Sequence, residues 1–187
     1  MEHKEYLKGK KVVFIIASNG YQPIEYGVPK KILESYGIKV ITASDKPGGA
    51  VASDQSTTLV DSTLDKLKPT DYDGVFFIGG PGAMDCLDNS ISYKIASEAK
   101  KHAIPYGAIC IAPRILAKAN ALAGKKATGW DDDLALETIF KGNGVEYAKG
   151  HDICTDGLVV TAVGPKAAEL FAQGIMRVLT KKALGDS

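Results

Sequence analysis

Residues 105–118 have the sequence PYGAICIAPRILAK. A short apolar run ends at Cys110 and a helical pattern begins shortly after it, which predicts a strand, a sharp turn and a helix. A nucleophile on such a turn needs small residues two positions before and after it, and Ala108 and Ala112 meet this need. The turn also places the sulfur near the first amides of a helix, where a thiolate is favoured. Cys110 is therefore the candidate nucleophile; the alternative is a free cysteine that closes a buried strand.

Patterns typical of strands and helices alternate along the rest of the chain. Apolar runs such as residues 12–17 are hydrophobic on both faces, as buried strands of a parallel sheet require. Asp156-Gly157 is a favoured hairpin turn between two late strands. The alternation predicts an α/β fold with a doubly wound, mostly parallel sheet, helices on both faces and a late β-hairpin. The expected strands are residues 12–17, 38–43, 73–79, 125–129, 145–148, 151–154 and 158–162, and the expected helices are residues 23–36, 64–67, 91–101, 131–140 and a closing helix after Pro165.

The first expected helix begins at Pro23, which suits a first helical position, and ends before Gly37. Pro29 lies inside this segment and is expected to kink it. The apolar residues that recur every four positions are Ile24, Val28, Ile32 and Tyr36, and they mark the face expected to turn inward.

Length, charge and cysteine content limit the classes of function. With 187 residues the chain is long enough for one core, and we expect an N-terminal tail over residues 1–10 and a single domain over residues 11–187. The 23 basic and 22 acidic residues leave no charge excess to attract nucleic acid or an anionic membrane. The apolar run at residues 12–17 is too short for a signal peptide or a membrane span. Three cysteines without a C-x-x-C pair indicate reduced thiols, a cytoplasmic location and no metal site.

The loops that follow the first, third and elbow strands are expected to converge, because ligands bind at the carboxyl ends of strands in such sheets. They supply Glu25, Gly80 and Cys110. The amides of Gly80 and Ile111 could form an oxyanion hole, although a tight turn is the alternative for the glycines. A protonated Glu25 could donate a hydrogen bond to the sulfur or move a proton, although a glutamate at a helix start is also ordinary capping chemistry.

Histidine is the usual base for a cysteine nucleophile. His3 lies in the expected tail, and His102 ends the helix before the elbow strand, at the far end of the sheet. His151 is therefore the histidine that could reach Cys110, and an ordinary surface or core residue is its alternative role.

Several segments together resemble one family. They are Gly79-Gly-Pro-Gly-Ala83, Ala108-Ile-Cys-Ile-Ala-Pro113, the first-loop Glu25, Thr128-Gly-Trp-Asp-Asp-Asp133 and Thr155-Asp-Gly-Leu-Val-Val-Thr-Ala-Val-Gly-Pro165. In this order and spacing, over about residues 10–183, the chain resembles the ThiJ/PfpI superfamily. The resemblance implies a flavodoxin-like fold, usually dimeric, with an easily oxidised cysteine at Cys110, a glutamic acid at Glu25 hydrogen-bonded to it, and an oxyanion amide at Gly80.

The chain departs from the family pattern at two positions. Peptidase-like members have histidine directly after the nucleophile, where this chain has Ile111, which weakens the hypothesis of a peptidase or related hydrolase. Glyoxalase and deglycase members often have a histidine near the position of Trp130, so a third catalytic group is absent or is supplied by His151. Trp130 is then expected to form a wall of the pocket or to act as a packing aromatic.

Two functions follow as hypotheses. In the first, the protein is a glyoxalase-like or deglycase-like enzyme in which Cys110 attacks a small aldehyde and Glu25 moves the proton, without a cofactor. In the second, it is a redox sensor or a protein protective in oxidative stress that works through oxidation of Cys110. The resemblance also implies a homodimer, and the first helix, with Tyr26 and Pro29 on its outer side, is the expected contact surface.

Overall fold

The computed structural model describes residues 4–185, and its elements follow the alternation expected from the sequence. The α-helices are α1 (Lys4–Leu7), α2 (Pro23–Ser35), α3 (Ala83–Leu87), α4 (Ser90–Lys101), α5 (Pro113–Lys118), α6 (Leu136–Gly142) and α7 (Ala168–Ala183), and the 3-10 helices are η1 (Leu64–Lys66), η2 (Pro69–Asp71) and η3 (Pro165–Ala167). The strands are β1 (Lys11–Ile16), β2 (Asn19–Tyr21), β3 (Lys39–Ser44), β4 (Gly48–Ala52), β5 (Thr57–Val60), β6 (Ser62–Thr63), β7 (Gly74–Phe77), β8 (Tyr106–Ile109), β9 (Lys126–Ala127), β10 (Glu146–Tyr147), β11 (Ile153–Asp156) and β12 (Val159–Ala162).

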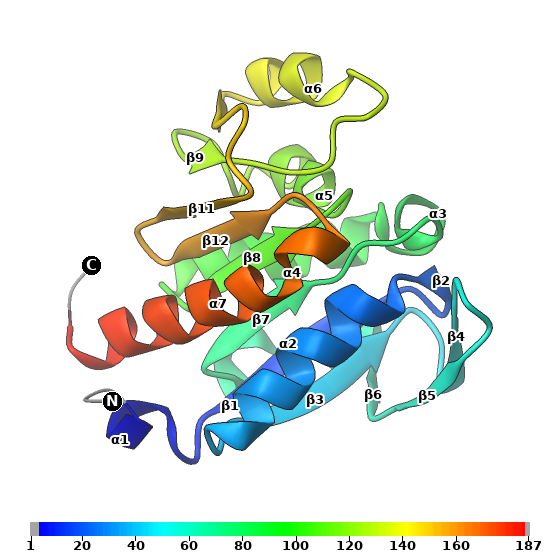
Figure 1. Ribbon diagram of the computed structural model, residues 1–187, viewed down its shortest axis with the longest axis vertical. Helices are drawn as coiled ribbons and strands as arrows, with labels where there is room; N and C mark the ends of the chain where they lie inside the picture. The colour runs from blue at the N-terminus through cyan, green and yellow to red at the C-terminus, as the bar shows by residue number, and fades with distance from the viewer. Residues whose placement is uncertain (1–3, 186–187) are drawn as a thin grey trace.

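A seven-stranded sheet with the order β11-β12-β8-β7-β1-β3-β6 forms the centre of the molecule (Figure 1). Its strand pairs are parallel except for β11, which pairs antiparallel with β12. The chain leaves β1 toward β3 and β6, and it then returns to the other side of β1 through β7 and β8. The order therefore reverses between β1 and β7, which is where ligands bind in sheets of this kind. The predicted α/β class, the doubly wound sheet and the late hairpin are confirmed.

Helices cover both faces of this sheet, as predicted. Helices α2 and α7 pack against each other on one face, and α4 and α5 contact β8 on the other (Figure 1). The β1 side chains from Val12 to Ile16 are fully buried between these layers. Burial on both faces explains why these strands are continuous apolar runs rather than alternating ones.

Two short segments differ from the sequence-based expectation. Residues 1–10 were expected as a tail, but Lys4–Leu7 forms α1, which contacts α7 and buries the side chain of Leu7. Residues 18–20 were expected as a turn, but Asn19–Tyr21 forms β2 and pairs with β4. In both cases a non-local contact supplies a partner that the local pattern does not show. The loop or hairpin expected for residues 44–58 is a hairpin of β4 and β5.

The first long helix, α2, turns a different face to the core from the one predicted. Its buried residues are Glu25, Tyr26, Pro29 and Leu33, whereas the side chain of Ile24 is 49% exposed. Tyr26 packs edge-on against the Phe14 ring, with ring centres 6.3 Å apart. The prediction that Tyr26 and Pro29 lie on the outer side of this helix is therefore wrong, because both residues are buried.

The three consecutive aspartates were expected inside the first turn of a helix, but α6 begins only at Leu136. Each aspartate has a different partner instead. Asp131 accepts a hydrogen bond from the Leu136 amide, Asp132 from the indole of Trp130, and Asp133 from Arg114. The aspartates thus fix the loop before α6 rather than its first turn.

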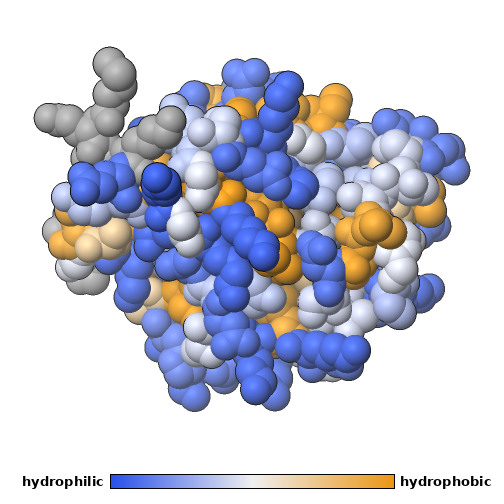
Figure 2. All heavy atoms as spheres, turned by 90° about the horizontal axis from the view of Figure 1, so that it is seen from below, coloured by the Kyte–Doolittle hydropathy of each residue, from blue (hydrophilic) through white to orange (hydrophobic). Residues whose placement is uncertain are grey.

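Hydrophilic side chains cover much of the face seen in Figure 2, and apolar side chains are exposed between them. Across residues 4–185, no helix combines the length and the apolar character needed to cross a bilayer.

Candidate active site

Cys110 lies on the sharp turn between β8 and α5, as the sequence predicts. Its backbone has φ +64°, in the left-handed region that residues other than glycine rarely adopt. Two hydrogen bonds hold this conformation: its amide donates to the Ala162 carbonyl at 2.9 Å, and its carbonyl accepts from the Trp130 amide at 2.8 Å. Strands β8 and β12 and the loop after β9 therefore all define the position of the sulfur.

Glu25 reaches the same place from the start of α2. Its side chain is fully buried (0% exposed), and its Oε2 accepts a hydrogen bond from the Gly79 amide at 3.1 Å. It does not cap the helix, because the side chain of Gln22 accepts the hydrogen bond from the Ile24 amide. The other oxygen, Oε1, is buried without a hydrogen-bond partner among the described residues.

Glycine is required at the two positions after β7 because other parts of the chain approach them closely. A Cβ atom at Gly79 would lie 2.6 Å from the Cys110 Cβ and 2.8 Å from Glu25 Oε2. A Cβ at Gly80, which has φ +117°, would lie 2.4 Å from the Gln22 amide nitrogen. Glycine at both positions lets the β7 loop pass between the elbow and the start of α2. The two readings of the glycine pair, tight turn and unhindered amide, are thus compatible.

Glu25 and Cys110 form an interacting pair of acids, a fully buried carboxyl and a partly buried thiol. Burial raises the pKa of Glu25 to about 7, and the Cys110 thiol and the Gly79 amide lower it by less. Burial, followed by the charge of Glu25 and its hydrogen bond, raises the pKa of Cys110 to about 12. The amides of Ile111 and Gly80 donate toward the sulfur and oppose this increase in part. The pair therefore loses its first proton near pH 7 and holds the second one far more tightly.

This result corrects the expectation that the elbow lowers the pKa of Cys110. The amides do favour the thiolate, as expected, but desolvation and the neighbouring carboxylate act more strongly in the opposite direction. Helix α5 has only six residues, so its positive end is also weak.

Gly164 completes this group of residues and was not identified from the sequence. It has φ +155°, and a Cβ there would lie 3.8 Å from Glu25 Oε1 and 4.0 Å from Cys110 Sγ. The missing side chain leaves space beside the Cys110 sulfur and the Glu25 carboxyl oxygen. The Gly164-Pro165 pair before the closing helix was the available signal.

The histidines are not brought into this group. His151 is exposed, its ring Nδ1 lies 3.2 Å from the Lys149 carbonyl oxygen, and none of its described contacts involves Cys110 or Glu25. The hypothesis that His151 reaches the site is therefore not supported by its position. His102 pairs with Glu98 on α4, and His3 lies outside the described residues.

The backbone of Trp130 lies against the turn that carries Cys110. Its amide binds the Cys110 carbonyl, and its indole donates to Asp132 at 3.1 Å. The buried Arg114, also missed by the sequence analysis, stacks near the Trp130 ring at 5.2 Å from its centre. An arginine in the first turn of an elbow helix that is apolar up to its last residue, Lys118, was the signal that could have identified it. Trp130 and Arg114 are thus linked to each other and to the Cys110 carbonyl, and the role of Trp130 as a pocket wall stays a prediction.

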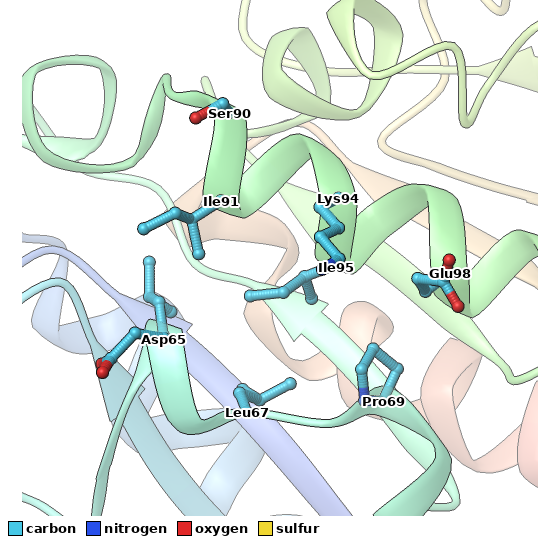
Figure 3. A pocket seen from close by; sticks show the side chains of 9 residues that line it. Asp65, Leu67, Pro69, Ser90, Ile91, Lys94, Ile95 and Glu98 are labelled. Atoms are coloured by element: carbon cyan, nitrogen blue, oxygen red, sulfur yellow. The ribbon is translucent and has the colours of Figure 1, made fainter.

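Residues 4–185 contain no cluster of three or more His, Cys, Asp or Glu side chains arranged to hold a metal ion. A cavity of about 430 Å³ lies apart from Cys110, between η1, η2 and α4 (Figure 3). Its apolar lining includes Leu64, Leu67, Pro69 and Ile95, with Lys94 and Glu98 among its polar residues.

Comparison with known proteins identifies relatives that match along most of the chain. A protein from Methanocaldococcus jannaschii, described as uncharacterized, is 30% identical over 181 residues, which cover 96% of this chain and 87% of the relative. A protein from Pyrococcus horikoshii, named as a deglycase, is 30% identical over 162 residues, which cover 87% of this chain and 93% of that protein.

Solved structures show the same fold. A ThiJ/PfpI domain protein from Brachyspira murdochii superposes with a TM-score of 0.86 at 24% identity, covering 93% of this chain and 98% of the other. Drosophila melanogaster DJ-1beta superposes with a TM-score of 0.79 at 24% identity, covering 95% and 98%. A family model described as the DJ-1/PfpI family matches residues 10–178. Because this match spans the sheet, Glu25, the glycine loop and the Cys110 elbow, the chain belongs to the DJ-1/PfpI family.

Proposed function

We propose that this protein is a cysteine-dependent enzyme that converts small 2-oxoaldehydes, with Cys110 as nucleophile and Glu25 as proton carrier. The observation that supports this most directly is the buried Glu25 carboxyl against the Cys110 thiol, with the amides of Gly80 and Ile111 directed at the sulfur. The relative from Pyrococcus horikoshii, named as a deglycase, also supports chemistry on reactive carbonyls.

The first step is the addition of sulfur to the aldehyde carbon. Above pH 7 the Glu25 carboxylate takes the thiol proton while the carbon–sulfur bond forms. The π electrons of the carbonyl move to its oxygen, and the Gly80 and Ile111 amides stabilise the oxyanion. The product of this step is a hemithioacetal on Cys110.

The second step moves a proton within the bound molecule. Glu25 first returns the thiol proton to the oxyanion, which gives the neutral hemithioacetal and frees the carboxylate. Glu25 then takes the proton from the former aldehyde carbon, and the C–H electrons form an enediolate as the hydroxyl proton moves to the neighbouring carbonyl oxygen. Return of the proton from Glu25 to the neighbouring carbon gives a thioester. Water then cleaves this thioester, which releases a 2-hydroxy acid and restores the thiol. The overall change adds one water to the 2-oxoaldehyde, so neither an oxidant nor a cofactor enters the balance.

The pH dependence of turnover tests this mechanism. Because the ionised carboxyl is the base, kcat/KM for methylglyoxal should rise about tenfold per pH unit below pH 7 and level off above it. Cys110→Ala and Glu25→Gln should both abolish turnover, whereas Cys154→Ala should retain it. Absence of turnover with wild-type protein across a panel of 2-oxoaldehydes would reject the proposal.

A second candidate function is redox sensing through Cys110. It is favoured by Glu25 Oε1, which is buried without a partner in the space beside the sulfur. A protonated carboxyl there could donate a hydrogen bond to a sulfinate oxygen, and the Gly80 and Ile111 amides could bind the other oxygen.

Mild peroxide treatment followed by peptide mass spectrometry tests this second function. Cys110 should retain a larger share of its oxidised form as sulfinate than Cys86 or Cys154, because Glu25 and the two amides stabilise the sulfinate oxygens, and Glu25→Ala should increase the share of sulfonate because the donor is lost. Because the pKa of Cys110 is raised, its thiolate fraction grows as the pH increases. Its oxidation should therefore accelerate with pH. Equal shares of sulfinate among the oxidised forms of the three cysteines would contradict this function.

We further propose a homodimer that uses the outer side of α2. The family resemblance supports dimerisation, and Ile24, whose side chain is 49% exposed, replaces Tyr26 and Pro29 as the apolar contact residue.

A further inference from the structure

Arg114 is a buried charge placed one helical turn beyond the nucleophile. Its side chain is 8% exposed, and its two terminal nitrogens donate to both oxygens of Asp133, Nη1 to Oδ2 at 2.9 Å and Nη2 to Oδ1 at 2.6 Å. The Arg114 guanidinium holds the pKa of Asp133 at about 2, so the pair stays charged across the working range. Such a bidentate pair fixes geometry as well as charge.

This ion pair connects directly to the backbone of Cys110. Arg114 Nη2 also donates to the Trp130 carbonyl at 3.2 Å, and the guanidinium lies over the Trp130 ring. The Trp130 amide in turn donates to the Cys110 carbonyl. A Cβ at Gly129 would lie 3.1 Å from the same carbonyl oxygen, which shows how closely this loop is held against the elbow.

The Cys110 carbonyl and the Ile111 amide belong to one peptide group, which is planar. When the Trp130 amide holds this carbonyl in place, it also sets the direction of the Ile111 N–H, and that N–H donates toward the Cys110 sulfur. Rotation of the peptide group would break both interactions together. The strained φ of Cys110 lowers the cost of such a rotation once the hold is released.

A role in fold stability alone does not account for an arginine here. Its Nε is buried without a partner, and its ion-pair partner Asp133 has a side chain that is 40% exposed, so solvent screening leaves the pair little net effect on stability. We infer that Arg114 is a positioning residue, which clamps Trp130 against the elbow so that the Ile111 amide stays directed at the sulfur. The inference rests on Cys110 as the reactive group of the proposed function, but its test needs no aldehyde turnover.

The test is the pH profile of iodoacetamide labelling of Cys110 in the intact protein, read by peptide mass spectrometry. Arg114→Gln and Asp133→Asn should move the profile to higher pH, because the amide that favours the thiolate is lost. Labelling at a given pH then falls about tenfold for each unit by which the thiol pKa rises. Arg114→Lys keeps the positive charge but loses the two parallel hydrogen bonds of the guanidinium. Its labelling profile should therefore lie between those of Arg114→Gln and the wild type.

Lys118→Gln is the matched control, since Lys118 lies on the same helix and pairs with Asp88 away from the elbow. Its profile should equal that of the wild type. Labelling of Cys86 and Cys154 in the same samples shows whether a variant has unfolded, and Asp133→Asn serves if Arg114→Gln does not fold. Lower thermal stability with an unchanged Cys110 profile, or faster labelling of Cys110, would overturn the inference.

Discussion

At the level of single residues, Cys110 combines a strained backbone conformation with the sulfur proposed as the nucleophile. A left-handed backbone costs a residue other than glycine about 1 kcal/mol or more. Hydrogen bonds to Ala162 and Trp130 at either side of the residue hold this conformation. A glycine would remove the strain but also the sulfur. Backbone preference does not explain a cysteine at this φ, whereas the proposed role of its sulfur does.

Glu25 should make stability depend on pH. Its pKa is raised from 4.5 to about 7 in the folded state, so its contribution is fully present below pH 4.5 and is lost as the pH rises through 7. The loss corresponds to about 3 kcal/mol in the free energy of unfolding. Glu25→Gln cannot ionise, so it should become more stable than the wild type by a similar amount as the pH increases from 4.5 to 8.

Urea unfolding across this pH range measures the difference. Glu34→Gln is the control, because Glu34 lies on the same helix with its side chain 46% exposed, and it should change the free energy of unfolding by about 0.5 kcal/mol at most. A constant difference between wild type and Glu25→Gln from pH 4.5 to 8 would show that the carboxyl titrates normally.

At the level of elements, α7 depends on a glycine to approach the sheet. A Cβ at Gly174 would lie 2.5 Å from Val160 Cγ2 and 2.9 Å from Ile153 Cδ1, so this residue sets the distance between α7 and the β11–β12 hairpin. Val160 is β-branched and belongs to a fully buried strand, which leaves it little freedom to move.

Alanine at Gly174 should therefore destabilise the protein by about 1–3 kcal/mol, because overpacking outweighs the gain in helix propensity. Alanine at Gly142, a helical glycine of α6 with no atom within 4 Å of its Cβ position, should instead add up to about 0.5 kcal/mol. Thermal unfolding of both variants gives the comparison. Equal effects of the same sign would contradict the packing argument.

At the level of the whole molecule, the reversal of strand order between β1 and β7 assembles the site. Glu25 follows β1, Gly79 follows β7 and Cys110 follows β8, and the carboxyl ends of these parallel strands share one edge of the sheet. Residues far apart in the chain thus meet without a dedicated loop.

Assembly of two chains gives the prediction at this scale. If α2 forms the proposed dimer contact, Ile24→Glu should reduce the mass in light scattering from that of two chains to that of one, because a charge enters an apolar interface. Leu134→Glu is the control, since Leu134 is 82% exposed in the loop before α6 and should leave the mass unchanged. A wild-type monomer at micromolar concentration, or a dimer that persists in Ile24→Glu, would reject this surface.

The sequence alone determined those features that depend on neighbouring residues. Apolar runs bounded by turns predicted β1, β3, β7 and β8, and a small-x-Cys-x-small pattern predicted the elbow, because a sharp strand-to-helix turn makes local steric demands. Parallel strands of a doubly wound sheet end at the same edge, and this rule predicted that Glu25 and Gly80 lie near Cys110.

Only the tertiary structure decided the features that depend on what surrounds a residue. Spacing along α2 could not show that Glu25, Tyr26 and Pro29 are buried while Ile24 is exposed, because a carboxyl on the buried face breaks the apolar period. The pKa of Cys110 follows from burial and from Glu25, which lies 85 positions earlier in the chain, rather than from the helix beside it. The hydrogen bonds of Arg114 to Asp133 and Trp130 likewise connect segments that no local sequence pattern predicts to be in contact. Desolvation and charge act through space and not along the sequence.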